Sequence, residues 1–303
     1  DRYMLAHLLR SILFVMFAVG CACLWYFRAE AWWLAWAGFW FPPVALASVL
    51  ALEFALAAVV NRADPAPRAR VRNWVIAWSR ELWTALKVFG WWMPFGQRTV
   101  PDFLPVAVTG QTGVVFVHGF FCNRGIWTPW LKILRKEGRA FSAINLEPVL
   151  GSIDHYASQV DVAVSRVTAA TGRPPVVICH SMGGLAVRAW LRSAGPTADQ
   201  RILRVITLGT PNSGTWLARF VRVANGRQMR HRGAWVRQLE AGEPAHRFTR
   251  FTCWYSNCDN VVFPASTATL AGADNRLASG LAHVELALDP EVMRCCLEGI
   301  RAS

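Results

Sequence analysis

The hydrophobic positions of this chain form two different patterns. Up to about residue 60 they make two nearly continuous runs, residues 11–27 and 31–60, separated by the polar break Arg28-Ala29-Glu30. Farther along, short apolar runs alternate with segments whose apolar residues recur every three or four positions. A run of about 20 apolar residues is long enough to cross a bilayer. The later alternation predicts strands and helices in turn, which is an α/β fold with a mostly parallel central sheet and helices on both faces.

Buried strands are predicted where apolar, largely β-branched residues cluster, and helices where the apolar spacing is three or four. The predicted strands are residues 114–117, 141–146, 176–179, 202–208 and 248–255. The predicted helices are residues 127–136, 153–171 and 185–191, together with a last helix capped by Asp289 and Pro290.

The two amino-terminal runs predict a transmembrane helical hairpin over residues 1–60. Aromatic residues gather around its turn, as they do at membrane interfaces: Trp25, Tyr26, Trp32, Trp33 and Trp36. Positive charges flank the hairpin at Arg2, Arg10, Arg62, Arg68, Arg70 and Arg72, whereas Arg28 in the turn is offset by Glu30. The positive-inside rule therefore predicts that both ends face the cytoplasm. Two alternatives are a cleaved signal peptide for the first run and a buried core helix for the second.

A second segment, residues 61–105, joins the hairpin to the α/β pattern. It begins with a linker rich in Pro and Arg, residues 61–72, which predicts a domain boundary. Trp74, Trp78, Leu82, Ala85 and Phe89 then fall on one helical face. Such a helix either lies in the headgroup layer of a membrane or packs on the following domain. Residues 91–105, with three prolines, predict irregular structure, and residues 106–303 form the predicted catalytic domain.

The amino-acid composition favours some classes of binding partner over others. The formal net charge of +13 comes nearly all from arginine, but no zinc-finger, RNA-recognition or helix-turn-helix pattern accompanies it. Arginines that flank apolar segments suit a membrane surface, so we expect a membrane partner and no nucleic acid. The eight cysteines lack zinc-type spacing and are expected to be mostly reduced, as on a cytosolic face, although Cys253 and Cys258 could pair. We expect no metal and no cofactor; the oligomeric state is left open.

Ser181 is the first candidate for chemistry. It follows the strand 176–179 and His180, and precedes Gly183, Gly184 and a helix. A serine on a sharp strand-to-helix turn is exposed as a nucleophile, and the N–H of Met182 then points to where an oxyanion forms. The alternative is a plain connecting turn. The N–H of Phe120, after a buried strand and His118-Gly119, is the second candidate oxyanion donor.

A serine nucleophile needs a base, and the base needs an orienting acid. Asp259 follows the predicted strand 248–255, and His283 lies in the last loop before the terminal helix. The chain order serine, acid, histidine suits a triad at the carboxyl edge of a parallel sheet. Separately, Asp259 could be a turn former and His283 a surface residue. The side chain of His180 is expected to point away from Ser181 by strand alternation, and His118 to shape the oxyanion loop.

Together these motifs resemble the bacterial lipase and carboxylesterase group of the α/β hydrolases, over about residues 112–300. The matching pieces are His118-Gly119-Phe120, His180-Ser181-Met182-Gly183-Gly184, Gly209-Thr210-Pro211-Asn212-Ser213-Gly214-Thr215, Asp259 with Val262 and Pro264, and Gly280-Leu281-Ala282-His283. The resemblance implies that Ser181 is nucleophile, His283 base and acid, and Asp259 its orienter, with Phe120 and Met182 as oxyanion donors. Cys179 replaces the usual glycine of the turn. Residues 213–245, apolar and arginine-rich, correspond to the family's lid or to an ordinary crossover helix.

We therefore expect a membrane-anchored serine hydrolase that cleaves carboxylic esters, with lipid acyl esters as substrates. Its expected location is the bacterial inner membrane, with the catalytic domain on the cytoplasmic side. Two alternatives use the same fold: an acyltransferase or thioesterase with the same triad, and a non-catalytic membrane scaffold.

Overall fold

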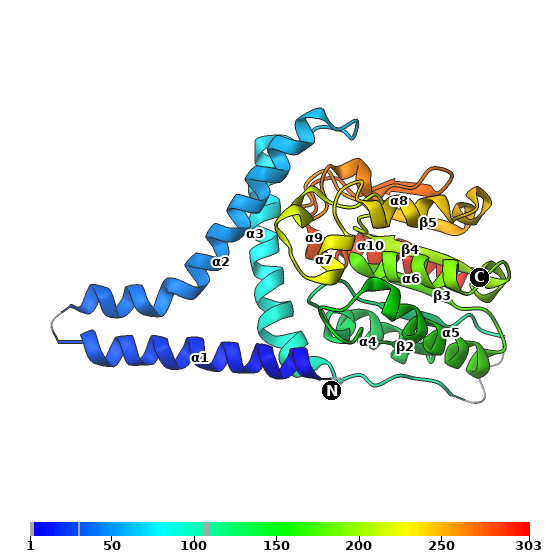
Figure 1. Cartoon of the computed structure of the whole chain (residues 1–303). Coiled ribbons are helices and arrows are strands. Elements are labelled where there is room, and N and C mark those ends of the chain that lie inside the picture. Colours follow the sequence, from blue (N-terminus) through cyan, green and yellow to red (C-terminus); the bar gives the residue numbers. More distant parts are fainter. Residues whose placement is uncertain (1–2, 30, 106–109) are drawn as a thin grey trace.

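A computed structural model describes residues 3–29, 31–105 and 110–303 (Figure 1). Arg2 and Glu30, which contribute to the predicted orientation, lie outside the described residues, as does the predicted start of the catalytic domain at residue 106. Residues 110–303 are called the α/β unit below, and the first two helices are called the hairpin.

The α/β unit is built on a six-stranded sheet in the order β2-β1-β3-β4-β5-β6, in which each adjacent pair is parallel. Its strands are β1 (Val114–Val117), β2 (Phe141–Ala143), β3 (Val176–His180), β4 (Arg204–Leu208), β5 (Phe251–Tyr255) and β6 (Asp274–Leu277). The predicted parallel sheet is confirmed. β2 ends three residues earlier than predicted. β6 was not predicted, because this edge strand is exposed and mostly polar.

Alternate residues of each strand face two separate cores, as the period of two in a strand requires. Val115 and Val117 of β1 pack toward α5 and α6, whereas Val114 and Phe116 pack toward α4 and α10. The helices of this unit are α4 (Thr128–Lys136), α5 (Ala157–Thr171), α6 (Met182–Ser193), α7 (Ala224–Gln228), α8 (Ala234–Ala241), α9 (His283–Leu286) and α10 (Pro290–Arg301). Asp289 caps α10 as predicted, accepting hydrogen bonds from two amides.

The hairpin consists of α1 (Met4–Phe27) and α2 (Trp32–Val60). Figure 1 shows α2 running beside α1 and then bending away toward α3. Pro42 and Pro43 lie inside α2 and account for this bend, because proline removes a helical hydrogen bond. Both helices are long and apolar enough to cross a membrane, although a signal sequence meets the same criteria.

The segment between hairpin and sheet is α3 (Val71–Lys87), followed by the π-helix η2 (Val88–Gly96). Irregular structure was predicted from residue 91 onward, so the helical structure extends further than predicted. Ala77, Glu81 and Ala85 of α3 are buried, and the helix packs against α9. Val75 and Trp83 remain exposed on another side of the helix. One face of α3 therefore contacts the α/β unit, and its position in a headgroup layer stays a prediction.

The eight cysteines all fall within the described residues, and all are free thiols. Cys253 and Cys258 are therefore not joined, and burial raises the pKa of both thiols, to about 11 and about 12.

One buried ion pair joins α6 to the segment after α8. The guanidinium of Arg188 contacts Glu243 at 2.6 Å and donates to the carbonyl of Asn212 at 2.7 Å, and neither charged side chain has any exposed surface. Replacing Arg188 by Leu leaves a buried carboxylate unpaired, so we expect the free energy of unfolding to fall by about 3–5 kcal/mol. Thermal unfolding in detergent measures this loss. Arg294→Leu, on the exposed face of α10, is the control and should leave the transition in place.

Candidate active site

Ser181 stands at the turn from β3 into α6. Its φ of 54° and ψ of −130° lie in a region that side-chain-bearing residues rarely adopt. Such strain persists only where the surroundings enforce it, and it is common at functional sites. The turn lifts the side chain out of the strand at the carboxyl edge of the sheet, as a nucleophilic serine requires. Its N–H remains tied to the carbonyl of Leu208 in β4.

Small residues make this turn possible. A Cβ added to Gly183 would lie 2.4 Å from the carbonyl oxygen of Val117, and one on Gly184 would lie 2.3 Å from Oγ1 of Thr210. A Cβ on Gly119 would lie 2.7 Å from the Cβ of Ser181. Cys179 is buried within β3, paired in register with Val117 and Thr207. The strained turn therefore forms with cysteine in place of the usual glycine.

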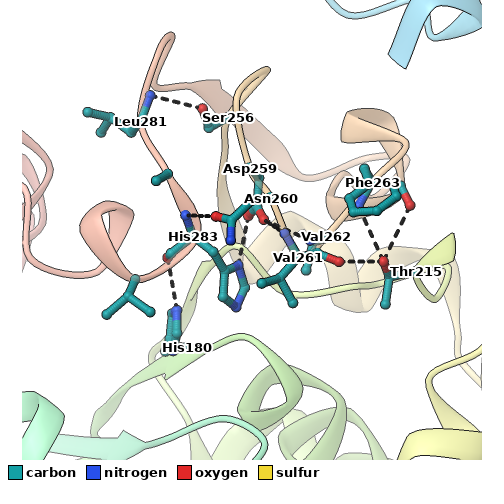
Figure 2. Close-up of polar contacts among 12 residues, drawn as sticks. His180, Thr215, Ser256, Asp259, Asn260, Val261, Val262, Phe263, Leu281 and His283 are labelled. Carbon is teal, nitrogen blue, oxygen red and sulfur yellow. Dashed lines mark hydrogen bonds and ion pairs between the residues drawn. The ribbon is translucent and has the colours of Figure 1, made fainter. Parts of the chain in front are cut away.

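Asp259 and His283 meet in space, although their positions in the sequence differ by 24. His283 Nδ1 donates to Oδ2 of Asp259 at 2.8 Å, and Oδ1 accepts from the amides of Val261 and Val262 at 2.8 and 2.7 Å (Figure 2). This assignment of the proton leaves Nε2 as the basic nitrogen. Asp259 lies beyond β5 as predicted, whereas His283 is the first residue of α9 and not part of an open loop.

The surroundings of His283 stabilise its protonated form. Burial by itself lowers the pKa of the ring, but the carboxylates of Asp259, Glu81 and Glu53 outweigh it and raise the pKa above the ordinary value of 6.5. A base with this shift holds a proton well once it has taken one, as a residue that later acts as acid must do.

Ser181 and His283 lie at the same edge of the sheet, but no hydrogen bond joins them in the described part of the chain. The carbonyl of Leu208 accepts a hydrogen bond from the amide of Ser181. A Cβ on the next residue, Gly209, would lie 3.3 Å from Nδ1 of His283. The centroids of the imidazole rings of His180, directly before Ser181, and of His283 are 4.7 Å apart. Catalytic hydrogen bonds often tighten only when substrate is bound, so this arrangement is compatible with base and nucleophile.

The two candidate oxyanion donors flank Ser181. Met182 is the first residue of α6, so its N–H has no acceptor within the helix. The N–H of Phe120 likewise donates to no acceptor among the residues that the structure describes. His118 holds the loop before Phe120, because its Nδ1 donates to the carbonyl of Gly119 and its Nε2 accepts from the amide of Leu146, each at 2.9 Å. Burial lowers the pKa of His118 to about 4, so the ring is neutral and fits this pattern.

Sequence reasoning gave no role to His180, Asn260 or Glu81, yet all three contact the turn that carries His283. Nε2 of His180 donates to the carbonyl of His283 at 3.1 Å, and burial lowers the pKa of His180 well below its ordinary value. Its position next to Ser181 was the only signal in the sequence. In the described ranges no group of three or more His, Cys, Asp or Glu side chains is arranged to hold a metal ion.

Comparison with known proteins agrees with this geometry. Residues 114–294 match the alpha/beta hydrolase family, so the chain belongs to the α/β-hydrolase family, and the predicted family is confirmed. The matched region begins after the hairpin and contains Ser181, Asp259 and His283. No curated protein matches the sequence.

Solved structures with a similar fold include lipases. The mature form of the Bacillus licheniformis lipase BlEst2 is 16% identical, with a TM-score of 0.56 over 66% of this chain and 96% of that chain. Aspergillus fumigatus lipase B is also 16% identical, with a TM-score of 0.55 over 67% of this chain and 56% of the other. At 16% identity, the similarity of this chain to the two lipases is evidence for a shared fold alone.

The raised pKa of His283 predicts the pH dependence of Ser181. Only the neutral ring can accept a proton, so the rate of reaction of Ser181 with a fluorophosphonate should rise with pH through a midpoint above 6.5. Rates measured across pH 5–9 give this midpoint. A flat profile, or a midpoint below 6.5, would contradict the assignment of His283.

Asp259→Asn removes the carboxylate that orients the ring of His283 and stabilises its protonated form. We expect the fluorophosphonate rate to fall by about 10³–10⁴-fold, with the midpoint moving to lower pH. Asp274→Asn, at the exposed edge strand β6, is the control and should behave like the unmodified protein.

Proposed function

We propose that this protein is a membrane-attached serine hydrolase that cleaves carboxylic esters, with lipid acyl esters as its substrate class. The observation that carries the proposal is the strained Ser181 at the sheet edge where Asp259 and His283 form a buried pair. The amides of Phe120 and Met182, which have no acceptor among the described residues, support the same chemistry.

In this mechanism Oγ of Ser181 attacks the acyl carbonyl while Nε2 of His283 takes the hydroxyl proton. The amides of Phe120 and Met182 stabilise the tetrahedral oxyanion. The intermediate collapses, and the ester C–O bond breaks as His283 returns the proton to the leaving alkoxide. The acyl-enzyme is then hydrolysed by a water whose proton passes to His283 and finally back to Ser181. Asp259 keeps the ring in the required tautomer and orientation throughout.

Membrane attachment is supported by the exposed apolar side chains of α1 and α2, among them Phe14, Phe17 and Phe41. A retained α1 is favoured over a cleaved signal peptide, because Leu5 and Leu9 belong to the same buried core as β1 and β3. Nε of Arg10 also donates to the carbonyl of Pro94 at 2.6 Å. The arginines at both ends of the hairpin favour a cytoplasmic α/β unit, and the family resemblance favours a bacterial inner membrane.

A lipid substrate is supported by residues 213–245, which we propose as a lid. Phe220 is exposed in this segment, and the guanidinium of Arg219 lies 3.9 Å from the ring centre of Trp216. Apolar and cationic side chains together suit acyl chains and anionic headgroups. Thr215, at the start of the segment, donates to the carbonyl of Val261 in the loop that carries Asp259.

Ser181→Ala is the direct test. Hydrolysis of a p-nitrophenyl ester should fall by at least about 10³-fold, because the nucleophile is absent. Ser158→Ala, on the exposed surface of α5, is the matched control and should keep full activity. Equal rates for the Ser181 variant and the unmodified protein would overturn the serine mechanism.

The alternatives give different outcomes. Preferential transfer to an added alcohol would identify an acyltransferase, and faster cleavage of acyl-CoA than of esters would identify a thioesterase. A Ser181 that does not react with a fluorophosphonate would favour a non-catalytic membrane scaffold.

A further inference from the structure

The carboxylate of Glu81 reaches from α3 to the turn that carries His283. Glu81 is only 2% exposed, and its two oxygens accept from the amides of Val284 and Glu285 at 2.8 and 3.0 Å. These are the two residues that follow His283 in α9. Amides in the first turn of a helix have no partner within the helix, so the carboxylate satisfies both donors from outside the α/β unit.

Asn260 connects the same turn to α2. Oδ1 of Asn260 accepts from the amide of His283 at 3.2 Å, and Nδ2 of Asn260 donates to Glu53 at 2.8 Å. Figure 2 shows Asn260 between Asp259 and the backbone of His283. The side chain next to the acid therefore links the base to α2.

Apolar packing accompanies these polar contacts. Phe54 of α2, Ala77 of α3, Cys258 and Ala282 form a buried cluster of their own, separate from the two cores of the sheet. Cys258 directly precedes Asp259, and Ala282 directly precedes His283. The hairpin and α3 thus pack on the residues that neighbour the acid and the base.

We propose that Glu81 is a positioning residue, which holds the turn bearing His283 and stabilises the protonated ring. This role rests on the proposed function, since positioning matters to catalysis only if His283 is the base. Within the α/β unit the backbone of the turn is held by His180 and Asn260 and by Glu285, whose side chain accepts from the amide of Ala282. Glu81 adds a negative charge and the hydrogen bonds to the amides of Val284 and Glu285.

The charge of Glu81 depends on its burial. Burial raises the pKa of Glu81 to about 7, although the two amides and the nearby His283 act in the opposite direction. The ionisable groups that face it are the ring of His283 and the carboxylate of Asp259, with Glu285 and Arg80 farther out on the same interface. Above neutral pH Glu81 is mostly ionised and favours the imidazolium of His283.

The test uses the full-length protein in detergent and the variants Glu81→Gln and Glu81→Asp. The ring pKa of His283, titrated by NMR, should fall by about 0.5–1 unit in Glu81→Gln because a nearby negative charge is lost. The second-order rate with a fluorophosphonate should fall on the order of 10-fold, since the turn is less well held. In Glu81→Asp the shorter side chain keeps the charge but cannot reach both amides, so the rate should fall while the ring pKa stays closer to that of the unmodified protein.

Glu291→Gln, on the exposed face of α10, is the matched control and should change neither reading. An unchanged ring pKa and an unchanged rate in Glu81→Gln would overturn the role of Glu81. If Glu81→Gln does not fold, Glu81→Asp decides, because a rate equal to that of the unmodified protein would show that the two amide contacts do not position the base. If the unmodified protein does not react with the probe, the proposed function fails. The NMR titration then still decides whether Glu81 raises the pKa of His283.

Discussion

The hydrogen bond between Asp259 and His283 is the constraint on which the site depends. The two residues come from different connections of the sheet, and the bond requires both to be held within hydrogen-bonding distance. Asp259 is fixed by the amides of Val261 and Val262, and His283 is fixed through its backbone. A side chain that is buried and hydrogen-bonded on several sides loses little further freedom when it acts, which is the physical basis of a preorganised site.

Much of this arrangement could be predicted from the sequence, because it follows from local patterns. The β-branched runs fix the buried strands, and Gly183 and Gly184 mark where a helix approaches the sheet too closely for side chains. Ser181 and Asp259 each follow a predicted strand, so both were expected at the carboxyl edge of a parallel sheet, and the chain order serine, acid, histidine pointed to His283 as the base. The parallel sheet and the family were predicted on this basis, and both are confirmed.

The remainder depends on contacts over long sequence distances. Glu81 follows Trp74 by seven positions and precedes Ala85 by four, so it lies on the apolar face of its helix. A carboxylate is nevertheless expected in water, and Glu81 is buried because the amides of residues 284 and 285 pair with it. A carboxylate that pairs with backbone groups leaves no pattern in the sequence, since every residue except proline has an N–H. β6 escaped prediction for a related reason, because its pairing with β5 needs backbone groups and not apolar side chains.

The bend in α2 at Pro42 and Pro43 has a practical consequence for dissecting the molecule. It brings the last third of α2 and the linker against the loop of Asp259, where Asn61 and Asp64 accept from the amides of Ala265 and Ser266. A shortened chain that begins after the linker would leave these two amides and Nδ2 of Asn260 without their partners. Shortening the chain for solubility would therefore remove contacts of the candidate active site, and a fragment that keeps these contacts has to retain the last third of α2.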